Sequence, residues 1–187
     1  MAEPGRPMRA DAVRTRKALV AAAAEVFAES GVDATVAEIA TRAGIGKGTV
    51  FRHFPTKDDL LAAIVAAAVD ELVAEADRLA PRDDALPAFM RFSADLYARN
   101  RAVVEALDRA GADRHPKVQA EVERLVAAAE RLTERARDAG VVRADVRGLD
   151  VVQLTCGVHH AAAPLARTEP DAGQRYADLV YAGLRVT

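Results

Sequence analysis

Two short helical segments joined by a glycine turn, between residues 35 and 54, constrain this chain more than any other feature. The first, TVAEIATRAG, begins with a capping-box pattern in which Glu38 follows Thr35 by three residues, and it ends at Gly44. The second, IGKGTVFRHFP, is helical until Pro55 stops it. Such a pair is the sequence form of a helix-turn-helix, whose second helix enters the DNA major groove.

The rest of the chain also predicts helices and shows no strand pattern. Hydrophobic residues make up 51% of the 187 residues, and the abundant alanine, leucine, arginine and glutamate favour helix. Apolar residues recur at helical spacing, and we therefore expect an all-α fold of about nine helices. Besides the short pair, the expected helices cover residues 11–30, 56–78, 87–100, 102–110, 117–139, 149–165 and 170–184.

A change in composition at APRDDALP, residues 80–87, suggests a junction between two halves. We expect a flexible basic tail at residues 1–11 and a three-helix DNA-binding domain at 12–72, with the helix-turn-helix at about 35–54. A C-terminal helical domain is expected at 79–187.

The distribution of charge favours a nucleic-acid partner for the N-terminal part alone. The net charge is −2, but residues 1–57 carry nine Lys or Arg against six Asp or Glu, whereas the remainder carries 17 against 22. One cysteine excludes an intramolecular disulfide and is typical of a reducing cytoplasm, where we expect the protein to act. No apolar run approaches the length of a membrane span, so no membrane partner is expected.

The second segment of the pair carries small, basic and polar residues that suit contact with a DNA duplex. Gly46 and Gly48 leave room for close approach, and lysine, arginine, threonine and histidine side chains donate hydrogen bonds to phosphate oxygens. An aromatic ring there can lie against a thymine methyl or a sugar. The candidate DNA-binding residues are Thr35, Lys47, Gly48, Thr49, Phe51, Arg52, His53 and Lys57.

These residues also carry a resemblance to a family. TVAEIATRAGIGKGTVFRHFPTKDDLL resembles the N-terminal DNA-binding signature of TetR-family (TetR/AcrR-type) transcriptional repressors of bacteria, and nearly every defining position matches. The segment AGVVRADV and the two apolar helices after it match the family's C-terminal pattern more loosely. The resemblance implies a homodimer that binds a palindromic double-stranded operator and releases it on binding a small-molecule effector. It also implies that the C-terminal bundle supplies the dimer interface and the effector site.

Two positions depart from the family pattern. Gly46 stands where a helix-capping serine is usual, so we expect a weaker cap. Phe51 stands where a tyrosine is usual; it keeps the ring and loses a hydroxyl, at an expected cost in DNA affinity of about 1 kcal/mol.

The C-terminal half offers weaker candidates. Residues 149–165 and 170–184 are more apolar than surface helices should be, and we expect them to form the dimer interface. The candidate effector-pocket residues are Phe89, Met90, Phe92, Tyr97, Cys156, His159 and His160, although an aromatic stripe is more often plain core. Cys156, His159 and His160 fall at i, i+3 and i+4, so they form an alternative soft-metal or redox site.

Other function classes fit less well. GIGKGT lacks the first glycine and the Ser or Thr of a phosphate-binding loop. Neither of the two serines lies in a nucleophile elbow, so we expect no enzyme activity and no cofactor. The alternative is a helical small-molecule or metal-sensing protein with a vestigial DNA-binding module. The sequence does not identify the effector or the operator.

Overall fold

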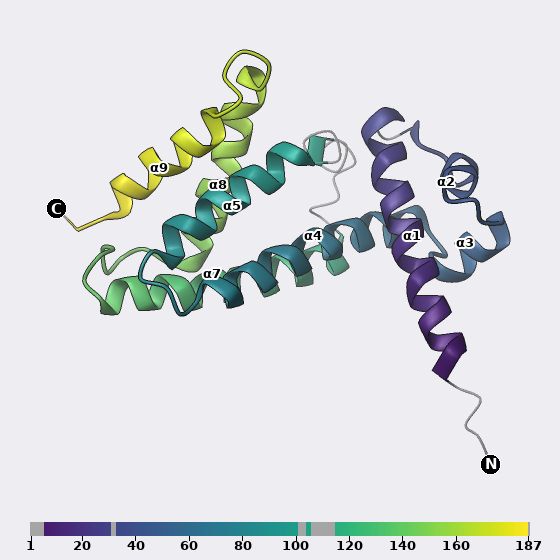
Figure 1. The fold of residues 1–187 in the computed structure, drawn as a ribbon, viewed down its shortest axis with the longest axis horizontal. Coiled ribbons are helices and arrows are strands. Elements are labelled where there is room, and N and C mark those ends of the chain that lie inside the picture. Colours follow the sequence, from purple (N-terminus) through teal and green to yellow (C-terminus); the bar gives the residue numbers. More distant parts are fainter. Residues whose placement is uncertain (1–5, 31–32, 101–103, 106–114, 187) are drawn as a thin grey trace. The chain divides into compact units, whose positions relative to one another are not determined.

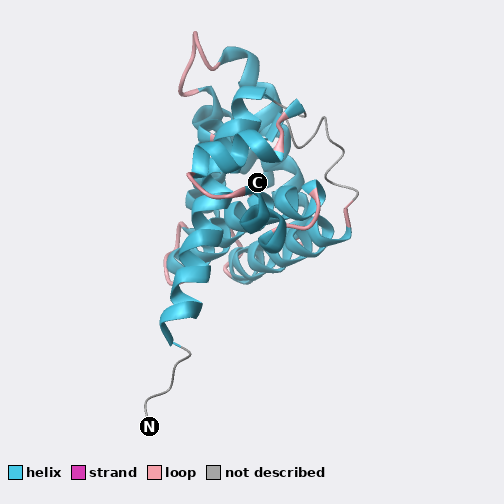
Figure 2. Cartoon of the chain, turned by 90° about the vertical axis from the view of Figure 1, so that its right-hand side faces the viewer, coloured by secondary structure: helices cyan, strands magenta, loops and turns pink. Residues whose placement is uncertain are grey.

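The computed structural model describes residues 6–30, 33–100, 104–105 and 115–186 (Figure 1). Within these residues the chain is helical, with no strand beyond a single bridge between Val142 and Arg185, which confirms the all-α prediction (Figure 2). The predicted helix at 102–110 lies almost wholly outside the described residues. The elements are α1 (Arg6–Ser30), α2 (Val36–Ala43), α3 (Lys47–His53), α4 (Lys57–Leu79), α5 (Ala85–Arg99), α7 (Pro116–Asp138), α8 (Gly148–Ala162), the 3₁₀ turn η3 (Ala163–Leu165) and α9 (Ala172–Leu184).

The described residues pack into two compact units. The first contains α1, α2, α3, α4 as far as Ala67, and the first turn of α7 as far as Val118. The second contains the remainder of α4, α5, the remainder of α7, α8 and α9. Two helices, α4 and α7, therefore contribute residues to both units. In the described part of the chain no helix is long and apolar enough to cross a bilayer.

Helix α1 begins earlier than the sequence predicts. It starts at Arg6, inside the stretch expected to be a flexible tail, while residues 1–5 lie outside the described residues. Pro7 suggested a break, but a proline in the first turn of a helix is tolerated because the N–H groups there have no intrahelical acceptor.

The first unit is held together by apolar side chains from α1, α2, α3 and the start of α4. Phe27 of α1, Ile39 of α2 and Val50 of α3 are each about 1% exposed. Because α2 and α3 are too short to be stable alone, this shared core holds them in place. The core residues are Leu19, Ala23, Val26, Phe27, Ala34, Ile39, Ala40, Val50, Phe54, Leu60, Leu61, Ala63 and Ile64.

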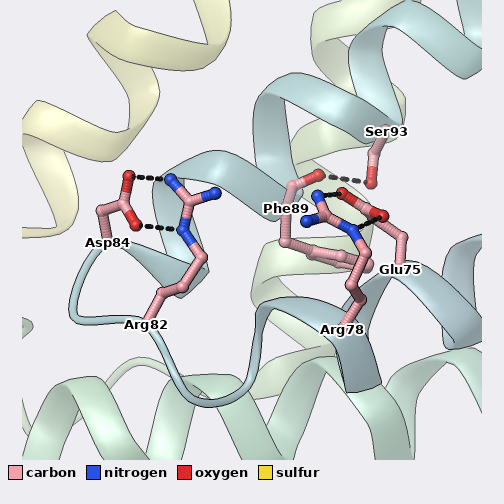
Figure 3. A network of polar contacts seen from close by, with 6 residues as sticks. All are labelled: Glu75, Arg78, Arg82, Asp84, Phe89 and Ser93. Carbon is pink, nitrogen blue, oxygen red and sulfur yellow. Dashed lines mark hydrogen bonds and ion pairs between the residues drawn. The ribbon is translucent and has the colours of Figure 1, made fainter.

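In the second unit, α5 packs against α8 and α9, and α8 packs against α9. Ion pairs fix the chain around the turn from α4 to α5: Glu75 with Arg78 at 2.5 Å and Arg82 with Asp84 at 2.7 Å (Figure 3). Inside α5, the buried Ser93 hydroxyl donates a 2.8 Å hydrogen bond to the carbonyl oxygen of Phe89. The buried hydroxyl is thereby satisfied within its own helix and does not break the apolar core.

The junction from α7 to α8 is tightly packed. Gly140 adopts φ +66°, the left-handed conformation that ends a helix. The C-terminal end of the chain is attached to the following loop, because the Val186 amide donates to the Val141 carbonyl at 3.1 Å. At Gly148, the first residue of α8, an added Cβ would lie 2.6 Å from the Cα of Glu130 in α7.

Gly148→Ala is therefore expected to destabilise the protein, because a methyl group would collide with the backbone of α7. We expect a loss of at least about 1–3 kcal/mol in the free energy of unfolding, the usual cost of overpacking. The control is Gly173→Ala near the start of α9, where an added Cβ would make ordinary contacts of 3.8 and 4.0 Å. Urea denaturation of both variants checks the prediction, and equal stability of the two would contradict the close approach.

Candidate functional site

The first helix of the predicted helix-turn-helix has both of the terminal signals expected from its sequence. The Thr35 amide donates to the Glu38 carboxylate at 2.8 Å, and the Glu38 amide donates to the Thr35 hydroxyl at 3.2 Å. The hydrogen bonds that the Glu38 carboxylate accepts from the Thr35 amide and, second, from the Thr35 hydroxyl at 2.8 Å lower the pKa of Glu38 below its ordinary value. At the other end, Gly44 has φ +66° and closes α2. The two signals fix where the turn to α3 begins.

Helix α3 has one exposed face and one buried edge. Val50 is buried, as is Phe54, the residue that caps the C-terminal end of α3. The opposite face carries four exposed residues, Lys47, Gly48, Phe51 and Arg52. Phe51 is 51% exposed, which is unusual for a large aromatic side chain that a core could have buried. This face is therefore the part of the first unit best suited to bind a partner.

The other predicted DNA-binding residues surround this face. Thr35 is exposed at the start of α2, and Thr49, His53 and Lys57 are half-buried. The guanidinium of Arg52 folds back on its own helix, donating to the Thr49 hydroxyl at 2.9 Å and to the Gly48 carbonyl at 3.3 Å. Contact between Arg52 and a phosphate would exchange these local hydrogen bonds for charge-assisted ones, which are stronger.

The start of α4 repeats the capping pattern, as its sequence predicts. The Thr56 amide donates to Asp59 at 3.2 Å, and the Asp59 amide donates to the Thr56 hydroxyl at 3.1 Å. Asp59 also pairs with Lys117 of α7. This pairing, followed by the Thr56 hydroxyl, lowers the pKa of the Asp59 carboxyl. The ammonium of Lys57 lies 5.4 Å from the Phe27 ring centroid, so this candidate phosphate ligand also packs on the core.

Arg42 positions the helix-turn-helix, although the sequence analysis did not identify it. Its guanidinium in α2 makes two hydrogen bonds with Glu29 of α1, at 3.0 and 2.6 Å, and one with Glu25 at 3.1 Å. Glu29 has a lowered pKa because of the hydrogen bond from Arg42. The partners lie 13 and 17 residues away in the sequence, so no local pattern connects them.

The cap of α3 is as weak as the sequence predicts. Gly46 makes no side-chain cap hydrogen bond, its backbone is extended, and nothing lies within 4 Å of a Cβ added there. Gly46→Ser is therefore expected to stabilise the protein by a few tenths of a kcal/mol, because a serine hydroxyl would accept a hydrogen bond from the first turn of α3. Thermal unfolding measures this, with Gly46→Ala as the control that adds a methyl and no acceptor. A serine variant no more stable than the alanine variant would count against the capping argument.

The candidate pocket residues of the second unit have different environments. Phe89 and Met90 are core residues, 2% and 0% exposed, while Phe92, Tyr97 and Cys156 are half-buried. The structure brings Tyr97 of α5 and His159 of α8 together as stacked rings, with centroids 5.2 Å apart. His160 is exposed. The Tyr97–His159 pair thus joins candidates from the two helices.

The alternative metal site receives no support. Across residues 6–30, 33–100, 104–105 and 115–186, no group of three or more His, Cys, Asp or Glu side chains is arranged to hold a metal ion. Cys156, His159 and His160 share helical spacing, but His159 is buried and His160 is exposed. Spacing along a helix therefore did not produce a converging set of ligands.

The helices predicted to form a dimer interface expose apolar side chains. On α8, Leu149 and Leu154 are 41% and 39% exposed, and on α9 Leu179 is 60% exposed. Gly157, Ala161, Ala182 and Gly183 are exposed on the same two helices. Leucine beside small residues would let another helix pack closely against these faces.

Two family models match the chain. Residues 19–64 match the model for bacterial regulatory proteins of the tetR family, and residues 80–186 match that for the C-terminal domain of SbtR-like transcriptional regulators. The first match covers the helix-turn-helix and its supporting helices. The second covers more than half of the chain.

Known transcriptional regulators are also similar to this chain in sequence and in structure. The HTH-type transcriptional repressor BepR of Brucella suis is 41% identical over 64 residues, which are 34% of this chain and 31% of BepR. A TetR transcription regulatory protein from Mycobacterium vanbaalenii is 33% identical, with a TM-score of 0.66, and the match covers 96% of this chain and 100% of that one. The SmeT–triclosan complex is 28% identical, with a TM-score of 0.70 and 92% coverage of both chains. The predicted family is confirmed, and this chain belongs to the TetR family of bacterial regulatory proteins.

Proposed function

We propose that this protein is a ligand-responsive transcriptional repressor that binds a palindromic operator as a homodimer and releases it when a small molecule binds. The observation that carries the proposal is the exposed face of α3, where a large aromatic and two cations surround a glycine. That composition suits a helix that approaches a duplex closely, and it has no use in the core of the first unit. Because its proposed partner is bacterial DNA, we expect the protein to act in the cytoplasm.

The DNA-binding region of the proposal is residues 12–72, with α3 in the major groove. Lys47 and Arg52 would neutralise phosphates, and Phe51 would contact a thymine methyl or a sugar. Thr35, at the start of α2, would donate a hydrogen bond to the DNA backbone on the other side of the major groove. A twofold dimer would present two copies of α3 to successive major grooves, about 34–36 Å apart for a spacing of one helical turn.

Residues 79–187 would supply the dimer interface and the effector site. The exposed apolar faces of α8 and α9, within residues 149–165 and 170–184, are the surfaces proposed to meet their copies across a twofold axis. SmeT, which has a similar fold, has been solved with triclosan. The Tyr97–His159 pair, in a unit whose buried residues are mostly apolar, favours an effector that is largely apolar and carries a hydrogen-bonding group.

Helix α4 is the element proposed to couple the two events, because it contributes residues to both units. An effector that binds one position of α4 more tightly than another would shift the spacing of the two recognition helices. A coupling free energy of about 1–3 kcal/mol, or roughly 5- to 150-fold in operator affinity, is typical of such systems.

Selection of bound duplexes from random sequence tests the proposal. The purified chain should enrich a palindrome, and the enriched duplex should bind more tightly than random duplex at physiological salt. Enrichment of no sequence, with equal binding to every duplex, would instead support a vestigial DNA-binding module. Loss of binding on adding an effector would then test ligand response.

Phe51→Tyr is expected to strengthen operator binding about fivefold for each protomer of the dimer, because the added hydroxyl can donate one more hydrogen bond, of about 1 kcal/mol, to a phosphate. Phe51→Leu is the matched variant that removes the aromatic ring and adds no donor, and it should weaken binding. Fluorescence anisotropy with the selected operator measures both. Equal affinity of the tyrosine variant and the wild type would mean that the ring edge does not face the DNA backbone.

A further inference from the structure

The N-terminal part of α1 extends beyond the core of the first unit. Within residues 11–30 of α1 the buried residues begin at Leu19, and residues 11–18 are exposed except for the half-buried Thr15. Because the helix starts at Arg6, about 20 Å of helix precedes Leu19 at 1.5 Å per residue. Figure 1 shows these turns running past α2 and α3. An exposed helical extension without a core of its own suggests a binding partner.

The extension carries exposed cations, and one of them lies near α3. Arg16 and Lys17 are exposed, and the Arg16 guanidinium lies 4.5 Å from the ring centroid of Phe54. Phe54 caps the C-terminal end of α3, so the charge of Arg16 lies beside that end of the helix. The one acidic residue of the stretch 11–18, Asp11, pairs with Arg14 and does not neutralise Arg16.

We propose that Arg16 and Lys17 form a second DNA-binding element, which contacts phosphates next to the bases that α3 reads. The inference rests on the proposed function and adds α1 to the interface. Its basis is charge complementarity: the exposed Arg16 lies beside the end of a helix proposed to enter a duplex that carries one negative charge per about 1.7 Å, and the exposed Lys17 is next to it in the chain. A planar guanidinium also binds phosphate in a bidentate manner.

A purely structural role for Arg16 is the competing explanation, since its guanidinium covers the Phe54 ring. Arg16→Met separates the two roles, because methionine keeps an apolar chain over the ring and removes the charge. Lys17 makes no such ring contact, so Lys17→Gln removes charge alone. Thermal unfolding should show Arg16→Met/Lys17→Gln to be as stable as the wild type.

The experiment measures how operator affinity depends on salt for the full-length dimer with the selected operator. The double variant should reduce the slope of log K against log salt by about 3.6, the value for four lost phosphate contacts, two in each protomer of the dimer. Operators with a single neutral methylphosphonate then locate the contacts. At a phosphate that Arg16 or Lys17 contacts, the methylphosphonate should weaken operator binding by the wild type and leave operator binding by the double variant unchanged. Arg135→Gln, an exposed cation of α7, is the control and should behave as the wild type.

Three outcomes are distinguishable. If Lys47→Ala/Arg52→Ala lowers the slope and the α1 variant does not, the inference is overturned and the proposed function stands. If neither variant changes the slope, the proposed function fails as well. If the α1 variant keeps the DNA slope but loses binding to phosphatidylglycerol vesicles, the extension contacts a membrane surface and the inference is again overturned.

Discussion

Replacing Lys47 and Arg52 together by alanine is expected to lower operator affinity by roughly 60-fold for each protomer, or roughly 4,000-fold for the homodimer, at 0.1 M salt and to flatten its salt dependence. Each phosphate contact contributes a slope of about −0.9 in log K against log salt, or about eightfold between 1 M and 0.1 M, and the effects of two contacts in each of two protomers multiply. Both side chains are exposed on one face of α3. Fluorescence anisotropy over a range of salt concentrations measures affinity and slope together.

The single variants measure how much each residue contributes to this loss of operator affinity. Lys47→Ala and Arg52→Ala should each remove about 1.8 from the slope, because each contact is lost in both protomers. Lys57→Ala should weaken binding less, because the Lys57 ammonium lies over the Phe27 ring and is already partly engaged. Arg135→Ala on α7 is the control for a general loss of charge. Unchanged slopes in all three single variants would mean that these residues do not contact phosphate.

The second large effect is expected at the proposed dimer interface. The double variant Leu154→Asp/Leu179→Asp should convert the protein from dimer to monomer at micromolar concentration. Twofold symmetry would bring four carboxylates into one apolar interface, where they would be desolvated without partners. Sedimentation velocity measures the oligomeric state. Operator affinity should also fall by about 100-fold or more, because two linked half-site contacts become two independent ones.

Val13→Asp is the matched control for this experiment. Val13 is 56% exposed, close to the 60% of Leu179, but it lies on α1. The control should remain dimeric, which would show that an exposed aspartate does not by itself prevent association. A wild-type protein that is monomeric, or a double variant that stays dimeric, would exclude α8 and α9 as the interface.

Much of the fold was predictable from sequence because its signals are local. The capping boxes at Thr35–Glu38 and Thr56–Asp59 and the left-handed glycine at Gly44 act within one helical turn, and all three have the predicted geometry. The start of α1 was not predictable in the same way. Pro7 and the basic residues around it suggested a tail, whereas a proline in the first turn is compatible with helix.

The sequence by itself determined the helices, their caps and the exposed cationic face of α3, because each depends on side chains and amides within four residues of one another. Only the tertiary structure decided which distant residues meet. It joined Arg42 to Glu29, stacked Tyr97 on His159 and brought the backbone of Glu130 against Gly148. It also buried His159 and left His160 exposed. The reason is physical: contacts between helices depend on how whole faces pack, and neither spacing nor composition along one helix specifies the neighbour it will meet.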